Sequence, residues 1–547
     1  MTLISHDYRD FESVRKDFRW NIPRHYNMAR EVCERHGHIA GKPAIFCESA
    51  AGEPRVYTFG DIKTLSDRLA NALRHWGIEK GDRVGIVLPQ RIETGLAHIA
   101  VHKLGAVSLP LSVLFGPDAI QYRLEDSGAK AVITLGHHVE MIQDIKDRLP
   151  NLETVIGCDG STADGSFWEA LNEASERFEI VDTLADDPAL LIYTSGTTGP
   201  PKGALVAHRS LIGNLPGFEL SQNFYPKPND VFWTPADWAW TGGLLDGLLP
   251  AWLYGTPIVG YEGGKFDPEH ALDLVERFGV TNAFIPPTAL KMMRQVPDLE
   301  SRKFKWRGIM SAGEAMGAEL YEWGKEVLNL EINEMWGQTE FNYIVGNSAP
   351  IMDVKPGSMG RPYPGHEVDA IDEDGNPMPT GQPGELAART GDPVMFLGYW
   401  NNEEATSAKI TRGWFRTGDV GYRDEDGYLW FVGRKDDVIS TAGHRVGPGE
   451  IEDCLLKHPA VAQAAVIGKP DALRGSVIKA FIVLARGVAG DDALKREIQS
   501  TVKSRLAAHE YPREIEFIEE MPMTTTGKVR RLELRARELK SMDTKPG

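Results

Sequence analysis

Short apolar segments alternate with longer segments of helical periodicity through the first part of this chain. The apolar segments include RVGIVLPQ, AVITLG, PALLIY, TPIVGY and TNAFIPP, and the helical ones include TLSDRLANALRHWG and PEHALDLVERFG. This alternation is typical of parallel sheets that are covered by helices. The chain is therefore predicted to have an α/β fold.

The pattern changes twice further along the chain. Between residues 355 and 433, short apolar segments are punctuated by Gly and Pro, which predicts an antiparallel or β-barrel-like piece. From about residue 435, alternating helix and strand patterns predict a compact α+β domain of roughly a hundred residues. We expect a large N-terminal domain, residues 1–434, and a small C-terminal domain, residues 435–547.

Composition excludes some classes of protein. The chain has 60 Lys and Arg against 78 Asp and Glu, a formal net charge of −18, which argues against nucleic-acid binding. Its four cysteines are far apart, without a CxxC pair or zinc-site spacing, which predicts reduced thiols. Because the sequence shows no apolar N-terminal run and no apolar stretch of membrane-spanning length, we expect a cytoplasmic protein without a stable membrane anchor.

A segment rich in glycine and hydroxyl side chains follows the apolar run PALLI directly. Glycine lets the main chain approach a ligand closely, and hydroxyl and backbone N–H groups donate hydrogen bonds to phosphate oxygens. A following lysine adds a mobile cation. A flexible polar loop is the alternative, but the Pro-Pro-Lys-Gly continuation favours a phosphate-binding loop. The residues concerned are Thr194, Ser195, Gly196, Thr197, Thr198, Gly199 and Lys202.

The common nucleotide-binding motifs are missing, since neither GxxxxGK[ST] nor GxGxxG occurs in the sequence. Kinase and dehydrogenase functions therefore lose their main support. The segment TSGTTGPPKG instead resembles the phosphate-binding loop of the adenylate-forming superfamily, which includes acyl-CoA synthetases, adenylation domains and luciferases. Further motifs match in order, so the resemblance covers about residues 40 to 535 and is closest to AMP-forming short- to medium-chain acyl-CoA synthetases.

Two of these motifs lie in the predicted N-terminal domain. In Trp336-Gly337-Gln338-Thr339-Glu340, the resemblance places a hydroxyl and a carboxylate, Thr339 and Glu340, at a catalytic Mg²⁺ site, and Gln338 at the nucleotide. The segment Ser311-Ala312-Gly313-Glu314 resembles the adenine-binding turn, which assigns Gly313 and Glu314 to ATP binding.

Of two more motifs, one precedes the expected domain boundary and the other spans it. In GWFRTGD, the resemblance assigns Asp419 to the two ribose hydroxyls. In GRKDD, it assigns Arg434 to the nucleotide and Asp436 to a hinge about which a mobile C-terminal domain turns. Arg445 would offer a further cation to a phosphate.

The C-terminal domain carries one motif for each of the two half-reactions that the resemblance implies. The loop containing Gly443 and His444 would lie against coenzyme A, and it can equally be a turn before a helix. In MPMTTTGKVRR, Lys528 occupies the position of the family's catalytic adenylation lysine. Because these residues serve different steps, the resemblance implies that rotation at Asp436 exchanges them.

The acyl pocket is predicted from small and aromatic side chains. In acetate-specific family members a tryptophan directly precedes Gln-Thr-Glu, whereas this chain has a glycine there, which predicts room for an acid larger than acetate. Ordinary core packing is the alternative for the aromatic residues. The expected pocket residues are Trp238, Trp240, Ala312, Gly337 and Phe341.

The sequence thus predicts an AMP-forming acid–thiol ligase. It would use ATP and Mg²⁺ to convert a medium-chain, branched or aromatic carboxylic acid to an acyl-adenylate and transfer the acyl group to coenzyme A. Two alternatives remain open, namely an enzyme that loads a carrier protein and a catalytically silent acyl or nucleotide sensor.

Overall fold

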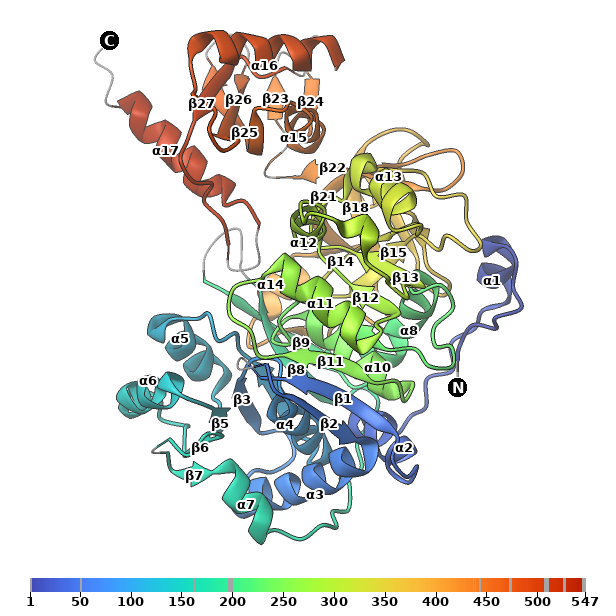
Figure 1. Ribbon diagram of the computed structural model, residues 1–547, viewed down its shortest axis with the longest axis vertical. Coiled ribbons are helices and arrows are strands. Elements are labelled where there is room, and N and C mark those ends of the chain that lie inside the picture. The colour runs from blue at the N-terminus through green and yellow to red at the C-terminus, as the bar shows by residue number, and fades with distance from the viewer. Residues whose placement is uncertain are drawn as a thin grey trace. The chain divides into compact units, whose positions relative to one another are not determined.

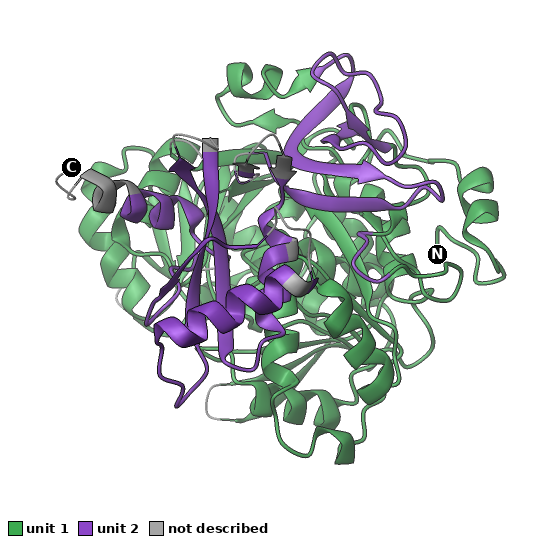
Figure 2. Ribbon diagram, turned by 90° about the horizontal axis from the view of Figure 1, so that it is seen from above, with its two compact units in different colours: residues 1–355, 360–367, 389–410 green, residues 356–359, 368–388, 411–547 purple. Residues whose placement is uncertain are grey.

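The computed structural model describes residues 2–49, 52–161, 163–194, 200–435, 437, 439–441, 444–471, 475–505, 511–524 and 528–543. The chain divides into two compact units. Unit 1 comprises residues 1–355, 360–367 and 389–410, and unit 2 comprises residues 356–359, 368–388 and 411–547 (Figure 2). Each unit has its own sheets and hydrophobic core. The predicted domain boundary at residues 434 and 435 stays a prediction.

Unit 1 contains an eight-stranded sheet among its described residues, in the order β19-β9-β8-β4-β3-β5-β6-β7. Its central strands β8, β4, β3, β5 and β6 pair in parallel, whereas β9 pairs with β8 antiparallel. The strands are β3 (Arg83–Val87), β4 (Val107–Pro110), β5 (Ala131–Thr134), β6 (Thr154–Gly157), β7 (Gly165–Ser166), β8 (Pro188–Thr194), β9 (Lys202–Ala207) and β19 (Gly398–Tyr399).

A nine-stranded sheet also lies within the described part of unit 1, in the order β16-β15-β14-β13-β12-β10-β11-β1-β2. The run from β14 to β1 is parallel. The strands are β1 (Pro43–Glu48), β2 (Pro54–Thr58), β10 (Phe232–Trp233), β11 (Ile258–Tyr261), β12 (Asn282–Phe284), β13 (Gly308–Ser311), β14 (Asn333–Gln338), β15 (Asn342–Gly346) and β16 (Arg361–Pro362).

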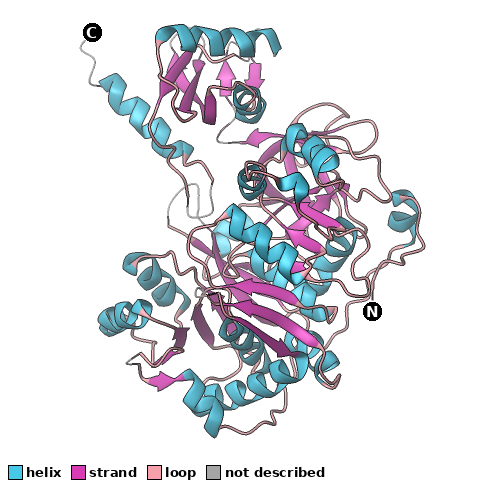
Figure 3. Cartoon of the chain, viewed as in Figure 1, coloured by secondary structure: helices cyan, strands magenta, loops and turns pink. Residues whose placement is uncertain are grey.

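Helices of unit 1 connect and cover these strands (Figures 1 and 3). They are α1 (Phe11–Asp17), α2 (Arg35–Gly37), α3 (Phe59–His75), α4 (Ile92–Lys103), α5 (Pro117–Ser127), α6 (His137–Ile145), α7 (Phe167–Glu173), α8 (Ser210–Ser221), α9 (Thr241–Gly243), α10 (Leu249–Leu253), α11 (Pro268–Phe278), α12 (Pro287–Met293), α13 (Gly317–Val327) and α14 (Glu403–Ser407). Short π-helical or 3₁₀ turns are η1 (Arg30–Glu34), η2 (Lys146–Arg148), η3 (Leu244–Leu248) and η4 (Leu299–Ser301).

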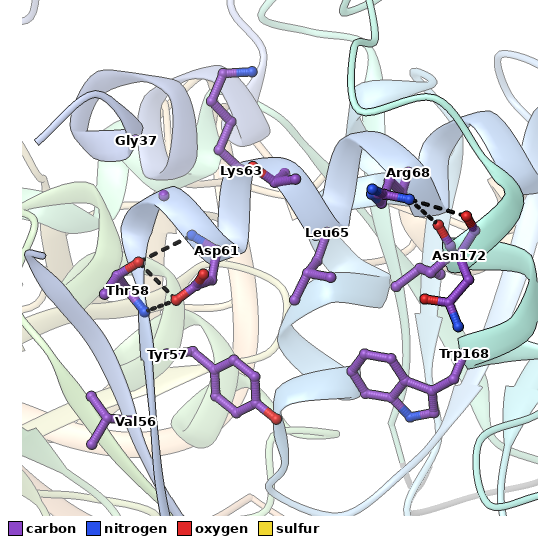
Figure 4. A pocket seen from close by; sticks show the side chains of 13 residues that line it. Gly37, Val56, Tyr57, Thr58, Asp61, Lys63, Leu65, Arg68, Trp168 and Asn172 are labelled. Atoms are coloured by element: carbon purple, nitrogen blue, oxygen red, sulfur yellow. Dashed lines mark hydrogen bonds between the residues drawn. The ribbon is translucent and has the colours of Figure 1, made fainter. Parts of the chain in front are cut away.

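Helix ends in unit 1 follow local sequence signals. At the start of α3, the Thr58 hydroxyl accepts the Asp61 N–H at 3.1 Å, and the Asp61 carboxylate accepts the Thr58 N–H at 2.7 Å (Figure 4). This reciprocal cap satisfies two N–H groups that the helix leaves unpaired. A hollow of about 720 Å³ beside this cap is lined in part by Tyr57, Lys63 and Trp168.

Unit 2 contains sheets of antiparallel and mixed pairing. Residues 368–434 build a five-stranded sheet in the predicted Gly/Pro-punctuated region, and residues after 439 build a compact α+β body, as predicted. The elements are β17 (Val368–Ile371), β18 (Gly384–Arg389), β20 (Ile410–Thr411), β21 (Trp414–Arg423), β22 (Leu429–Arg434), β23 (Ile439–Thr441), β24 (His444–Val446), α15 (Pro448–Leu456), β25 (Val461–Asp471), β26 (Gly475–Leu484), α16 (Asp492–Arg505), β27 (Glu514–Phe517) and α17 (Arg531–Asp543).

Each layer of helices encloses apolar side chains against its sheet. In unit 1, Leu272 and Leu320 pack with Ile309 under the nine-stranded sheet. In unit 2, Ile451 and Ile498 pack with Ile482 between the helices and β26. The observed layers confirm the predicted α/β class with a smaller α+β C-terminal domain.

Candidate active site

Predicted site residues of unit 1 meet at one edge of the nine-stranded sheet. Strands β14, β13, β12 and β10 are parallel neighbours, so their carboxyl ends lie side by side. Gln338 ends β14, and the segment 312–314 follows β13. Open α/β sheets bind ligands in the crevice outside the carboxyl ends of their strands. The structure therefore brings the predicted adenine turn and the Gln-Thr-Glu motif to neighbouring strand ends.

The predicted adenine turn is fixed to the helix that follows β12. One Glu314 carboxylate oxygen accepts the backbone N–H of Thr288 at 3.0 Å and also accepts the Thr288 hydroxyl. The Ser311 hydroxyl donates to the carbonyl of Ile285 at 2.8 Å. Gly313 has φ of +101°, a conformation that favours glycine. These bonds hold the turn in one conformation.

Glu340 is held in place by β19 and by the segment that precedes it. The Tyr399 hydroxyl donates to Glu340 Oε1 at 2.5 Å, and the Phe396 N–H donates to the Glu340 carbonyl at 2.7 Å. A carboxylate and a neighbouring hydroxyl, Thr339, supply the oxygen ligands that Mg²⁺ prefers. Within the described ranges, no group of three or more His, Cys, Asp or Glu side chains is arranged to hold a metal ion. Protein Mg²⁺ sites often use one or two carboxylates and complete the shell with substrate phosphates, so these residues fit such an ion.

The predicted phosphate-binding loop connects β8 with β9. Thr194 ends β8 and lies opposite Lys202, the first residue of β9. The loop residues Ser195, Gly196, Thr197, Thr198 and Gly199 lie outside the described residues. Lys202 Nζ lies 5.4 Å from the centroid of the Tyr399 ring, so Tyr399 contacts both the lysine of this loop and Glu340.

Tyr399 was not predicted from the sequence, because Gly-Tyr-Trp carries no motif of its own. Its position follows from pairing of β19 with β9, where Tyr399 lies opposite Ala204. The side chain is 8% exposed. Only this strand pairing, which joins segments about two hundred residues apart, shows that the tyrosine belongs to the site.

A Tyr399→Phe substitution tests this contact. It removes the hydroxyl that orients Glu340 and keeps the ring beside Lys202. We expect the apparent affinity for Mg²⁺ to fall by about 10-fold, which is the usual size of an outer-shell effect. The measurement is the rate of pyrophosphate release as Mg²⁺ is varied at fixed ATP. Tyr422→Phe, on the five-stranded sheet of unit 2, is the matched control, and an unchanged Mg²⁺ dependence in Tyr399→Phe would contradict the assignment.

The aromatic residues predicted for the acyl pocket differ in exposure. Trp238 and Phe341 are fully buried, whereas Trp240 is partly exposed and packs edge-on against Phe115, with ring centroids 5.7 Å apart. Buried aromatic side chains are consistent with a pocket wall and with core packing alike. Their role in acyl binding stays a prediction.

Two polar side chains that the sequence analysis missed fix the segment carrying these tryptophans. Gln90 Nε2 donates to the carbonyls of Thr234 and Ala236 at 3.0 and 2.7 Å. The Ser112 hydroxyl donates to Asp237 at 2.8 Å. Burial raises the pKa of Asp237 despite this bond and the N–H of Ala239. No sequence motif marks Gln90 or Ser112, since both act through contacts distant in sequence.

Gly337 has a second structural reason to be glycine. A Cβ atom there would lie 1.6 Å from the backbone oxygen of Asn342 and 2.4 Å from Tyr343 Cα. The pairing of β14 with β15 shifts register between Trp336 and Gly337, which brings the two backbones together. In this hairpin conformation a side chain at position 337 would meet main-chain atoms, whatever acid is bound. Ala312, the other small residue, is partly exposed after β13.

In unit 2 two of the predicted nucleotide-binding residues form a pair. Asp419 on β21 lies opposite Arg434 on β22, and Arg434 Nη1 lies 2.6 Å from Asp419 Oδ1. The side chain of Asp419 is 6% exposed and that of Arg434 is 35% exposed. A buried carboxylate held by an arginine keeps its second oxygen oriented, which suits a bidentate partner such as a ribose.

The predicted coenzyme A loop lies at a hairpin. Strand β23 pairs with β24, with Thr441 opposite His444 and Ser440 opposite Arg445. Gly443 and the predicted hinge residue Asp436 lie outside the described residues.

Lys528 lies on the returning arm of another hairpin and is exposed. Its backbone N–H donates to the Thr524 hydroxyl at 3.0 Å, and the Thr524 N–H donates to the Lys528 carbonyl at 2.7 Å. Met523 and Val529 form a β-bridge in the same hairpin. Helix α17 begins three residues after the lysine, at Arg531.

Comparison with protein-family models decides the family. The model described as AMP-binding enzyme matches residues 33–400, and the model of the AMP-binding enzyme C-terminal domain matches residues 450–528. The chain belongs to the AMP-binding enzyme family.

Curated relatives of this AMP-binding enzyme align over nearly their whole length. An acetyl-coenzyme A synthetase of Bacillus subtilis (strain 168) is 40% identical, covering 98% of this chain and 96% of the relative. The mitochondrial acyl-coenzyme A synthetase ACSM3 of Mus musculus is 35% identical, covering 98% and 95%. These relatives confirm that the AMP-binding enzyme is an acid–thiol ligase of the acyl-CoA synthetase type.

Solved structures agree with this assignment. The anthranilate CoA ligase AuaEII in complex with anthranoyl-AMP has a TM-score of 0.88 at 30% identity, covering 95% of this chain and 99% of that one. A benzoate CoA ligase from Burkholderia xenovorans LB400 has a TM-score of 0.82 at 29% identity, covering 93% and 100%. The predicted adenylate-forming fold is therefore confirmed for this AMP-binding enzyme.

Two general predictions were also made from the sequence. The cysteines Cys33, Cys47, Cys158 and Cys454 are all free thiols in the structure. Among the described residues of this AMP-binding enzyme, no helix combines the length and the apolar character that crossing a bilayer requires.

Proposed function

We propose that this enzyme activates a carboxylic acid larger than acetate, of medium chain length, branched or aromatic, with ATP and transfers the acyl group to coenzyme A. The observation that carries the proposal is that Tyr399 contacts both Glu340 of the Gln-Thr-Glu motif and Lys202 of the phosphate loop, while the adenine turn follows the strand next to β14 in unit 1. We place the reaction in the cytoplasm, where free thiols are stable.

In the first half-reaction the substrate carboxylate attacks the α-phosphorus of ATP and pyrophosphate leaves, which produces an acyl-adenylate. Negative charge gathers on the phosphate oxygens, so fixed cations and oriented donors provide most of the catalysis. Lys528 neutralises the reacting oxygens, and Lys202 with residues 194–199 holds the phosphates. Mg²⁺ bound through Glu340 and Thr339 would neutralise further phosphate charge.

In this proposal the nucleoside is held by residues of several motifs. Gly313 and Glu314 line the adenine, with Gln338 beside it. Asp419, held by Arg434, accepts the ribose hydroxyls, and Arg445 binds a phosphate.

In the second half-reaction the coenzyme A thiolate attacks the acyl carbon, and AMP leaves. Gly443 gives the narrow thiol arm a passage without a side chain, and His444 lies beside it. The C-terminal domain turns about Asp436 between the two steps, so that the loop at Gly443 replaces Lys528.

In this proposal Trp238, Trp240 and Phe341 form the walls of the acyl pocket, and Ala312 leaves room at its base. Gly337 lies beside the pocket, but the direction of its missing side chain is filled by the backbone of Asn342 and Tyr343. The names of two similar structures, an anthranilate and a benzoate CoA ligase, support an acid of aromatic size.

Acetate is the second candidate acid. It is favoured by the name of the Bacillus subtilis relative, an acetyl-coenzyme A synthetase that is 40% identical to this chain. The main-chain atoms beside position 337 also weaken the argument from its missing side chain.

The test is a pyrophosphate-release screen of acetate, short, branched, medium-chain and aromatic acids, with and without coenzyme A. We expect release only when an acid is present, acyl-CoA by mass spectrometry only with coenzyme A, and kcat/KM for the best larger acid at least about 10-fold above that for acetate. A preference for acetate would support the second candidate. Acyl transfer to a phosphopantetheine carrier protein but not to coenzyme A would support a carrier-loading enzyme, and no release with any acid would support a silent sensor.

A further inference from the structure

Four charged side chains in unit 2 join the helix after Lys528 to the residue after the predicted hinge. Arg535 Nη2 of α17 lies 2.7 Å from Asp437 Oδ1, and Arg531 Nη1 lies 3.6 Å from Asp437 Oδ2. Arg531 Nη2 also lies 2.6 and 2.7 Å from the two oxygens of Glu452 on α15. We call Asp437, Glu452, Arg531 and Arg535 the clamp.

The clamp is well shielded from water. Exposed fractions of its side chains run from 13% for Glu452 to 24% for Arg535. Glu452 also accepts the backbone N–H of Val466, at the centre of β25, at 2.7 Å. Ion pairs that are shielded and share several hydrogen bonds are more rigid than exposed pairs.

Apolar packing fixes the other side of the same helix and hairpin. Leu534 of α17 and Met521 at the base of the hairpin are 1% and 3% exposed, in one cluster with Phe481 of β26. Lys479 and Lys469 pair with Glu538 of α17, Lys469 at 3.1 Å. The hairpin that carries Lys528 is therefore attached to the body of unit 2 by its core and to Asp437 by the clamp.

From this geometry we infer that Asp437 is a positioning residue for Lys528. The inference rests on the adenylation role proposed for that lysine and on the proposed hinge at Asp436. If rotation occurs at Asp436, the rotating body begins at Asp437. The clamp then makes the first residue of that body and the lysine hairpin move as one piece, so that rotation at the hinge places Lys528 accurately.

Loss of the clamp should affect only one half-reaction. Asp437→Asn keeps the shape of the side chain but removes the charge that holds Arg535 and Arg531. A lysine misplaced by about 1 Å should slow adenylation, and small misplacements cost up to roughly 100-fold in rate. The coenzyme A loop at Gly443 follows β23, which packs against β25 and β26, so thioester formation should be retained.

The experiment measures the two half-reactions separately in the full chain, by ATP–pyrophosphate exchange with a substrate acid and by acyl-CoA formation from supplied acyl-adenylate. For Asp437→Asn we expect kcat of adenylation to fall roughly 10- to 100-fold. The KM for ATP and the rate of thioester formation should stay within about 2-fold of the wild type. Asp437→Glu, which keeps the charge, should recover part of the loss.

Arg537→Gln is the matched control, because it breaks another ion pair of α17, with Glu516, without touching Asp437. It should leave both half-reactions unchanged. Equal loss of both half-reactions in Asp437→Asn, or full adenylation activity, would overturn the inference. If Asp437→Asn does not fold, Arg535→Gln removes the same pair from the helix, and full adenylation in that variant would overturn it equally.

Removing the lysine itself separates the two proposals. If Lys528→Ala adenylates at the wild-type rate, the proposed function of the lysine is wrong, whatever Asp437 does. If Lys528→Ala is defective and Asp437→Asn is not, only the positioning role of Asp437 is wrong.

Discussion

A Lys528→Ala variant should form acyl-adenylate about 10²- to 10³-fold more slowly than the wild type, the usual cost of removing one preorganised charge from a transition state. Negative charge on the α-phosphate and the attacking carboxylate grows during the step, and the ammonium group stabilises it. Acyl-CoA formation from supplied acyl-adenylate should stay close to the wild-type rate. The measurement is ATP–pyrophosphate exchange beside the thioester assay.

Lys495→Ala is the control for this substitution. Lys495 lies on α16 of the same unit and pairs only with Asp492 among the ion pairs found in the described chain. It should leave both rates unchanged. Adenylation at full rate in Lys528→Ala would contradict the proposed catalytic role, and loss of both half-reactions would indicate a folding defect.

Stability of unit 1 should depend on pH through three buried histidines. The ring of His102 lies 6.2 Å from that of His98 and 5.7 Å from that of His208. Burial lowers the pKa of His102 from 6.5 to about 4, and burial with the neighbouring His102 lowers the pKa values of His98 and His208 well below their usual range. The folded protein therefore keeps these rings neutral.

Because the folded pKa of His102 is below its unfolded value, the unfolded chain binds a proton first as pH falls below 6.5. The free energy of unfolding should thus decrease between pH 6.5 and about pH 4. In the wild type, Nε2 of His102 lies 3.1 Å from the Ala189 carbonyl oxygen. His102→Gln replaces the ring with an amide, which is also polar but cannot titrate. Relative to the wild type, the variant should gain about 2 kcal/mol between about pH 8 and about pH 5.

Urea-induced unfolding of both proteins at the two pH values measures this difference. Other titrating groups contribute equally to both proteins, so their effects cancel in the difference. One such group is buried Glu219, whose pKa is raised to about 7, so that its contribution to the free energy of unfolding falls as pH rises from 4.5 to 7. His75→Gln, at an exposed position of α3, controls for the change of residue type. A stability difference between wild type and His102→Gln that is independent of pH would contradict the prediction.

Local patterns were sufficient to predict the fold class and the order of the motifs. Apolar runs such as PALLI became the parallel strand β8, and the Gly/Pro-punctuated region became the five-stranded sheet. These features depend on neighbouring residues in the chain, which is the information that a sequence displays.

Contacts between distant segments could not be predicted in the same way. Tyr399 reaches Glu340 and Lys202 only because β19 pairs with β9, and Asp437 reaches Arg535 across almost a hundred residues. Gly337 was interpreted from its missing side chain alone, whereas its closeness to Asn342 depends on a shift of register between two strands. Such effects arise from tertiary packing and have no local signal.

The crowding of main chain at position 337 limits how this lineage can change its substrate. A mutation that introduced a large residue there would meet peptide atoms of the opposite strand rather than empty space, so the hairpin itself would have to be rebuilt first. Adaptation to shorter acids is therefore expected to proceed through predicted pocket residues that already carry a Cβ, such as Ala312.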